Sequence, residues 1–232
     1  MRTAGTTEPL TALSPGLSRV GDLPLQAARR YGECTAIICG DARAAFNEID
    51  TWSASLAGYL ADPVNGEGIA PGERVIVYGG NSIGWVVSYY AALRTGAIVV
   101  PVNKLLTPAE LAYIAGHCGA RFLLGSTASL APLAREPALA ALPQLRWDGE
   151  GGAFTEATRA GHAAPALPES EAVLDEPASI CYTSGTTGRP KGATLTHRNI
   201  LTNVLLTATL HGKTAQDVML SALPCPHVYG NV

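Results

Sequence analysis

Residues 182–192 read Y-T-S-G-T-T-G-R-P-K-G, and this stretch decides the fold. Seven of the ten residues from Thr183 to Gly192 are Gly, Ser or Thr. An apolar run typical of a strand leads into the stretch, and apolar residues at helical spacing follow it. Glycine lets backbone N–H groups turn towards an anion, hydroxyl groups add donors, and Lys191 supplies a positive charge. This is the chemistry that holds the phosphates of a nucleotide.

The position of the lysine narrows the kind of phosphate site. A Walker A loop places Lys directly after its last Gly and a hydroxyl residue directly after the Lys. Here Pro190 precedes Lys191 and Gly192 follows it, so a P-loop kinase or NTPase is not indicated. The other interpretation of such a composition is a surface turn. The complete string with its continuation over 193–199 favours the phosphate site.

The longer string at 182–199, Y-T-S-G-T-T-G-R-P-K-G-A-T-L-T-H-R-N, resembles the phosphate-binding signature of the adenylate-forming superfamily. That superfamily contains acyl-CoA synthetases, aryl-CoA ligases, luciferases and the adenylation domains of peptide synthetases. Two more stretches resemble it in the same order, one over 81–103 and the other, L-P-C-P-H-V-Y-G, over 223–230. The chain therefore resembles the N-terminal part of an AMP-dependent synthetase of the acyl-CoA synthetase type.

The resemblance implies a reaction and a set of residues. ATP would activate a carboxylic acid to an acyl adenylate with Mg²⁺ present, and CoA as co-substrate would then form the thioester. Lys191 is the expected catalytic cation, and Thr183 is also expected to touch Mg²⁺. His227 is expected to be catalytic and, with Tyr229, to line the substrate pocket. The residues expected to line the phosphates are Thr183, Ser184, Gly185, Thr186, Thr187, Gly188 and Lys191.

Two features near the end of the chain bear on the substrate. The superfamily usually has an aromatic residue before the histidine, but Pro226 stands there, which changes the expected pocket shape. Amino-acid-activating relatives tend to carry an Asp near this place, and no acidic residue lies between Met219 and Val232. A fatty, aryl or short aliphatic acid is therefore favoured. An amino-acid adenylation domain and a truncated, non-catalytic nucleotide-binding remnant stay open as alternatives.

Composition limits the partners. The chain has 232 residues, 47% hydrophobic and 15% charged, with a net charge of −3. Without a basic run, nucleic acid is not an expected partner. Five cysteines form no C-x-x-C pair, which is typical of reduced thiols, and core packing is expected for His117 and Cys118. No signal peptide or transmembrane segment is apparent, so a cytoplasmic protein is expected.

The fold class predicted is α/β, as stacked α/β subdomains of the adenylate-forming N-terminal domain, incomplete in this chain. The expected organisation is a flexible tail at 1–18, a first α/β subdomain at 19–147, a linker or surface excursion at 148–177, and the start of a second α/β subdomain with the phosphate-binding loop at 178–232. Strands are expected at 35–39, 74–78, 97–102, 121–124, 178–182 and 219–223. Helices are expected at 22–31, 47–60, 83–95, 108–118, 126–142 and after the loop.

Several further side chains have ordinary explanations. Asn81 and Asn103 follow strands, where caps and turns are usual, and Asn47 is expected to cap a helix. His197 and Arg198 are expected to be solvated residues at a helix start. Three aromatic residues are expected in the core: Trp85, Tyr89 and Tyr90.

The resemblance also implies what lies beyond this sequence. Relatives run to about twice its length. Their adenine site, ribose-binding Asp, Mg²⁺-linked acidic residue and C-terminal catalytic Lys all come after the part that this chain matches. We therefore expect the chain to need a missing C-terminal region for turnover.

Overall fold

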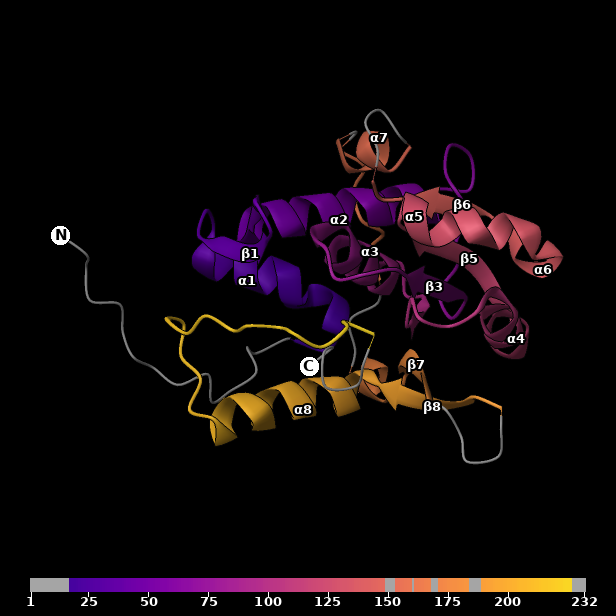
Figure 1. Ribbon diagram of the computed structural model, residues 1–232. Coiled ribbons are helices and arrows are strands. Elements are labelled where there is room, and N and C mark those ends of the chain that lie inside the picture. Colours follow the sequence, from indigo (N-terminus) through magenta and orange to yellow (C-terminus); the bar gives the residue numbers. More distant parts are fainter. Residues whose placement is uncertain (1–16, 149–152, 160, 168–170, 184–188, 227–232) are drawn as a thin grey trace.

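A sheet of six strands forms the centre of the protein, in the spatial order β6-β5-β3-β4-β7-β8. The computed structural model describes residues 17–148, 153–159, 161–167, 171–183 and 189–226. Neighbouring strands run parallel from β6 to β7, and β8 runs antiparallel to β7. Helices lie on both sides of this sheet (Figure 1). The alternation of strands and helices in the sequence thus produces the mixed α/β fold that it predicts.

The sheet strands are β3 (Arg74–Tyr78), β4 (Ile98–Val102), β5 (Ala120–Gly125), β6 (Gln144–Arg146), β7 (Pro177–Thr183) and β8 (Lys191–Thr196). Two more strands, β1 (Thr35–Cys39) and β2 (Ala42–Ala45), pair as a separate antiparallel hairpin. The longer helices are α1 (Leu23–Tyr31), α2 (Phe46–Ala61), α3 (Ile83–Arg94), α4 (Pro108–Cys118) and α8 (His197–Leu210). Shorter ones are η1 (Val20–Asp22), α5 (Thr127–Leu130), η2 (Ala131–Arg135), α6 (Pro137–Ala140), α7 (Ala153–Arg159) and η3 (Glu171–Asp175).

The central strand β3 contributes to two cores, one on each face of the sheet. Val75 and Val77 belong to a cluster that includes residues of α2 and α3, whereas Ile76 and Tyr78 belong to a second cluster with α4. Successive side chains of a strand point to opposite faces, so alternate residues separate in this way. All four are buried, which explains why β3 is a continuous apolar run in the sequence.

Helix starts follow the local chemistry in most places. At α4, the Thr107 backbone N–H donates to the Glu110 carboxylate (2.8 Å) and the Glu110 N–H donates to Thr107 Oγ1 (3.3 Å), which completes the predicted capping box. The helix predicted over 47–60 is present as α2, but its predicted N-cap, Asn47, is wrong, because the helix begins at Phe46 and Ala45 is the N-cap residue. Glu48 accepts the Ala45 N–H, so a carboxylate satisfies the end that Asn47 was expected to cap.

Two predicted elements differ in the structure. The helix expected over 126–142, with a proline interruption, is three short helical segments, because Pro132 and Pro137 each interrupt the ladder of backbone hydrogen bonds. The expected strand over 219–223 is absent from the described chain, and Met219 and Leu220 are exposed there. A strand needs a neighbour for its backbone groups, and no described strand lies beside this segment.

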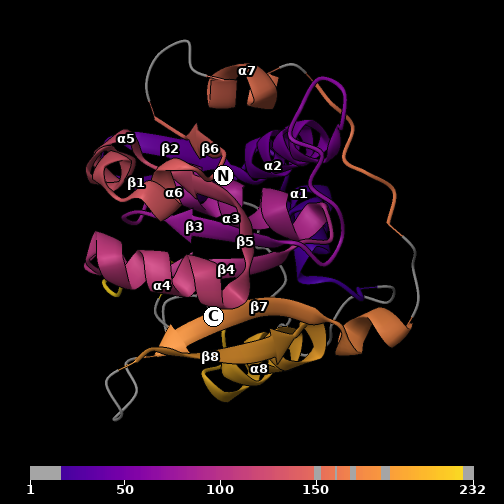
Figure 2. The ribbon, with the colours of Figure 1, turned by 90° about the vertical axis from the view of Figure 1, so that its right-hand side faces the viewer.

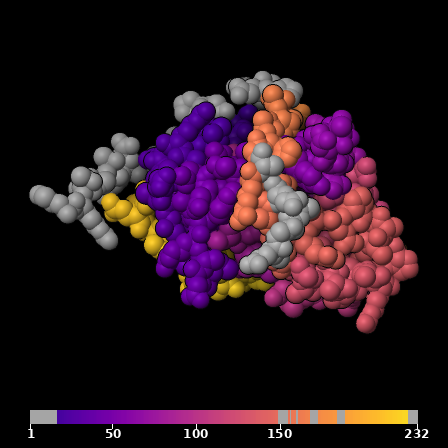
Figure 3. All heavy atoms as spheres, turned by 90° about the horizontal axis from the view of Figure 1, so that it is seen from above, coloured from indigo at the N-terminus to yellow at the C-terminus, as the bar shows by residue number. Residues whose placement is uncertain are grey.

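The strands on either side of 148–177 share one sheet. Strand β7 pairs with β4, and the Ser179 hydroxyl donates to the Val99 carbonyl (3.0 Å). Figure 2 shows β7, β8 and α8 along one end of the molecule. The expected boundary is therefore not a change of sheet, and the division into subdomains stays an expectation. Between these strands, the described residues 153–159 and 161–167 lie along one face of the molecule (Figure 3), and the Ser55 hydroxyl donates to the Ala157 carbonyl beneath them (2.6 Å).

A buried arginine connects three segments of the first core. Arg94 Nε donates to the Gly21 carbonyl (3.0 Å), and its Nη1 donates to the Asp50 carbonyl (2.7 Å). Its second terminal nitrogen forms an ion pair with the Asp50 carboxylate. Buried charges are tolerated only when paired and hydrogen-bonded in this way, and losing one partner leaves the other uncompensated.

We expect Arg94→Met to lower the free energy of unfolding by about 3–5 kcal/mol, because it leaves the Asp50 carboxylate without its partner. Arg121→Met is the control, since Arg121 is 52% exposed and lies 3.7 Å from Glu73; its loss should be below about 1 kcal/mol. Urea denaturation monitored by circular dichroism measures both. Equal losses would contradict the role assigned to Arg94.

Candidate functional site

The glycine-rich stretch joins β7 to β8 at one edge of the sheet. These strands pair in register from Pro177 opposite Thr196 to Thr183 opposite Lys191. Because β7 runs parallel to β4, its carboxyl end lies at the edge where β3, β4 and β5 also end. Ligands of open α/β sheets bind at this edge. The topology therefore places the loop where a ligand site is expected.

The structure brings two of the predicted site residues together. Thr183 and Lys191 are register partners at the two ends of the loop, and both are exposed. The other predicted residues lie outside the described residues: Ser184, Gly185, Thr186, Thr187, Gly188, His227 and Tyr229. The structure thus describes both strands that carry the loop. The Thr183 hydroxyl and the Lys191 ammonium belong to paired residues at the loop end of these strands.

Lys191 is available to a ligand as far as the described residues show. The ion pairs among them join Arg94 to Asp50, Arg121 to Glu73 and Arg198 to Asp175, and Lys191 takes part in none of these. An exposed ammonium beside a threonine hydroxyl is a suitable partner for phosphate oxygens, to which charged donors form the stronger hydrogen bonds. The donor set therefore fits a nucleotide tail.

Gly192 follows the lysine for a steric reason. A Cβ atom at this position would lie 2.7 Å from the Ile180 side chain and 3.1 Å from the ring of Tyr182. Both neighbours are on β7, so a side chain here would push the two strands apart. The glycine of the motif thus keeps the strand pair close at the end where Lys191 stands.

The helix after β8 starts with a buried histidine. The prediction of a solvated His197 is wrong: its side chain is 4% exposed and its Nδ1 accepts the backbone N–H of Val20 (3.1 Å). Burial, and secondarily the charge of Arg19, lowers the pKa of His197 to about 4. Arg198 is exposed, as expected, and forms an ion pair with Asp175 (2.7 Å). Sequence spacing alone could not reveal a partner 177 residues away.

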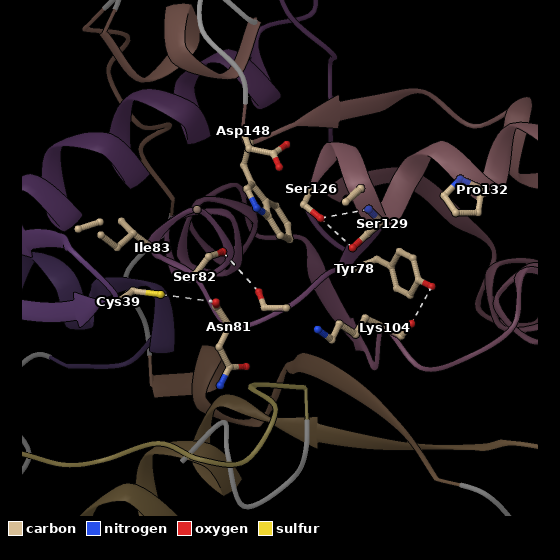
Figure 4. A pocket seen from close by; sticks show the side chains of 15 residues that line it. Cys39, Tyr78, Asn81, Ser82, Ile83, Lys104, Ser126, Ser129, Pro132 and Asp148 are labelled. Carbon is tan, nitrogen blue, oxygen red and sulfur yellow. Dashed lines mark hydrogen bonds between the residues drawn. The ribbon is translucent and has the colours of Figure 1, made fainter.

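A pocket of about 670 Å³ opens at the same edge of the sheet (Figure 4). Segments that follow four parallel strands line it, through Asn81 and Ser82 after β3, Lys104 after β4, Ser126 after β5 and Asp148 after β6. This volume lies within the range of small-molecule sites. The lining combines hydroxyls, an amide and charged groups, so the pocket suits a polar ligand.

Trp147 forms one wall of this pocket. Cβ atoms at Gly79 and Gly84 would each lie 2.5 Å from its indole ring, so both positions must stay bare for the ring to pack there. The close approach fixes the chain after β3 against the chain after β6. The glycines around Asn81 therefore serve the shape of the pocket wall.

Asn81 is a residue whose importance the sequence does not indicate. Its Nδ2 donates to the Leu223 carbonyl (2.8 Å), and its Oδ1 accepts the Cys225 N–H (2.7 Å). The Asn81 amide thus bonds to both a carbonyl and an N–H of the backbone, as a neighbouring strand would, in the segment that leads to position 227. Asn103 has the ordinary role expected of it, because its Oδ1 accepts the N–H of Leu105 two residues on. Both residues are asparagines that follow a strand, and only their tertiary contacts distinguish the role of Asn81 from that of Asn103.

The described ranges hold neither a metal-ligand cluster nor a membrane-spanning helix. They contain no cluster of three His, Cys, Asp or Glu side chains that could hold a metal ion. The assignment of Thr183 to Mg²⁺ therefore stays a prediction. Among the described helices, none has the length and apolarity that crossing a bilayer requires.

The fold and the loop together define an N-terminal domain of the adenylate-forming type. The family described as "AMP-binding enzyme" matches residues 25–232, and the chain belongs to this family. It is 33% identical over 174 residues to the long-chain-fatty-acid–CoA ligase FadD13 of Mycobacterium tuberculosis, covering 75% of this chain and 34% of that one. It is 30% identical over 238 residues to the acyl-CoA ligase sidI of Aspergillus fumigatus, covering 92% and 39%.

A solved structure agrees with these sequence matches. The o-succinylbenzoate CoA synthetase MenE of Bacillus subtilis, in complex with AMP, superposes with a TM-score of 0.73 and 25% identity, covering 90% of this chain and 50% of that one. The chain spans about a third of the length of the curated relatives named here, at 34% and 39%. The family and fold predictions are therefore confirmed.

We expect the stability of the protein to fall as the pH is lowered from about 6.5 to about 4 through His197. In this window the unfolded chain binds a proton at His197 and the folded chain does not, so protonation favours unfolding. His197→Gln should make the urea midpoint less dependent on pH. His211→Gln, at an exposed histidine, should keep the wild-type slope. Identical slopes for all three proteins would refute the assignment.

We expect Asn81→Ala to raise the hydrogen exchange rate of the Cys225 amide by roughly fivefold, because a net hydrogen bond contributes about 1 kcal/mol and 1.4 kcal/mol is a factor of ten. Asn103→Ala should leave the exchange rate of the Cys225 amide unchanged, because the Asn103 side chain accepts a hydrogen bond from Leu105 in its own turn. Exchange measured by mass spectrometry on peptides covering 219–226 tests this. An unaltered rate in the Asn81 variant would show that the contact is dispensable.

Proposed function

We propose that this chain is the nucleotide-binding part of a ligase that uses ATP to activate a carboxylic acid as acyl-AMP and then forms a thioester with CoA. The observation that carries the proposal is the pair Thr183 and Lys191 at the ends of the glycine-rich loop. Membership of the AMP-binding family supports it. The proposal concerns the whole protein, of which this chain matches about a third in the relatives, at 34% and 39% of their length.

The loop would act on the charge that develops during activation. A carboxylate oxygen attacks the α-phosphorus of ATP, and pyrophosphate leaves with the negative charge. Backbone N–H groups and hydroxyls over 183–188 would hold the β- and γ-phosphates in line, and the Lys191 ammonium would neutralise the departing charge. Mg²⁺, when bound, neutralises the same oxygens, and the Thr183 hydroxyl would contact it. His227 and Tyr229 would face the acyl group.

The carboxylic acid and CoA, the thiol acceptor, are proposed from the residues near the ends of the parallel strands and from the residue types over 219–232. The absence of an acidic residue over 219–232 favours an acid without an ammonium group, such as a fatty, aryl or short aliphatic acid. The relatives' own names include ligases of long-chain fatty acids and of indoleacetate, which are acids of this kind. The pocket beside Lys104 would take a polar part of a substrate. The phosphates of CoA would fit the Lys104 ammonium and the serine hydroxyls that line this pocket.

We expect Lys191→Ala in the full-length gene product to slow ATP–pyrophosphate exchange tenfold or more. A charge-assisted hydrogen bond contributes about 1.5–3 kcal/mol, which corresponds to at least a factor of ten. The control is Lys213→Ala, which removes a lysine beyond α8 and should keep wild-type exchange. The assay is run with fatty, aryl and amino acids in turn. Unchanged exchange in the Lys191 variant, in the presence of an accepted acid, would rule out its role.

A further inference from the structure

Helix α4 contacts the strand that leads into the phosphate-binding loop. The hydroxyl of Tyr182, at the loop end of β7, and Nδ1 of His117 are joined by a hydrogen bond of 2.6 Å. Their rings also meet edge to face, with centroids 5.7 Å apart. Tyr182 comes directly before Thr183, so the contact lies next to the residue that we assign to the phosphates.

The same helix also contacts the chain after the loop, at Arg189, two residues before β8 begins. The guanidinium of Arg189 lies 5.6 Å from the ring centre of Tyr113, within the range of a cation–π interaction. Tyr113 is one helical turn before His117, and their rings are 5.6 Å apart. Arg189, Tyr113, His117 and Tyr182 thus form a continuous row, which we call the α4 brace. One of its ends lies on each side of the loop.

At the loop end of the strand pair, side-chain packing replaces backbone pairing with β4, and Ile180 and Tyr182 pack against the second core there. The register of β7 with β4 consists of Ser179 opposite Val99 alone, towards the start of β7. On its other side, β7 pairs with β8, which is the last strand of the sheet. The backbone ladder therefore fixes β7 to the sheet three residues before Tyr182, and side chains must hold the rest.

The chemistry of the row suits a permanent contact. Burial first, and then the neighbouring Cys118 and Tyr113, raises the pKa of Tyr182 to about 12. Its phenol therefore stays protonated at neutral pH and keeps its hydrogen to share with the imidazole. The Arg189 guanidinium supplies the cation over the Tyr113 ring.

We propose that Tyr113 and His117 are positioning residues for the phosphate-binding loop. They act through Arg189 and Tyr182, and they set how far apart the two strands stand where Thr183 and Lys191 face each other. This inference rests on the proposed function, because it assigns ATP to the loop. Neither residue touches the substrate, so their effect must appear in the order of the strand ends and in the use of ATP.

Two measurements on the full-length gene product test the inference together. His117→Ala and Tyr182→Phe should each raise hydrogen exchange in peptides covering 180–192 roughly three- to tenfold, and the double variant should add little, because both remove one shared bond. Exchange over 74–78 in β3 should not change. The KM for ATP should rise by a similar factor in the same variants, whereas the KM for the acid should stay near the wild-type value.

Matched variants separate positioning from general damage. Tyr113→Phe keeps the ring under Arg189 and should behave as wild type, whereas Tyr113→Leu should reproduce the loss. His117→Gln restores a polar partner for the phenol and should recover part of the ATP affinity. His211→Ala removes an exposed histidine at the far end of α8 and should change neither measurement (Figure 1).

The outcomes distinguish the two proposals. A wild-type protein that shows no saturable use of ATP overturns the proposed function, and the inference with it, whatever the exchange data show. A wild-type protein that uses ATP while His117→Ala and Tyr182→Phe leave exchange or the KM for ATP unchanged overturns the inference alone. Additive effects in the double variant would show that the two side chains do not act through one bond.

Discussion

The parallel pairing of β7 with β4 is the contact on which the candidate site depends. It adds the strand pair β7–β8 to a sheet whose other parallel strands already end at one edge. The loop after β7 therefore opens at the same edge as the pocket formed after β3, β4, β5 and β6. A buried hydroxyl, Ser179, reinforces this pairing by donating to the Val99 carbonyl. Without this pairing, the two halves of the site would be unrelated in space.

Side chains complete what the backbone ladder begins. The α4 brace reaches the chain on both sides of the loop, at Tyr182 and Arg189, and Asn81 binds the segment at 223–225 through both atoms of its amide. His197 receives the N–H of Val20 and joins the start of the described chain to the helix after β8. Each of these contacts joins segments that are far apart in the sequence. Together they hold the strand pair, the start of α8 and the segment at 223–225 against the rest of the fold.

The errors of the sequence interpretation have a common physical cause. Asn47 is a good capping residue, but Glu48 reaches the free N–H of Ala45 and the helix starts earlier. His197 looks like a solvated helix start, but the chain before α1 covers it. The apolar run at 219–223 has the composition of a strand and no described strand beside it. In each case a hydrogen-bonding partner, present or missing, decided the outcome, and the preference of the residue itself did not.

Local chemistry in the sequence was sufficient for the family, the α/β class and most helix and strand positions. These depend on patterns of a few adjacent residues, such as the spacing of Gly, Thr and Lys or the box of Thr107 with Glu110. Tertiary structure alone decided that β7 and β8 extend the first sheet, that Asn81 differs from Asn103, and that Tyr113 and His117 meet the loop strands. Such contacts join residues many positions apart, and a local pattern carries no information about which distant backbone or side chain will complete a hydrogen bond.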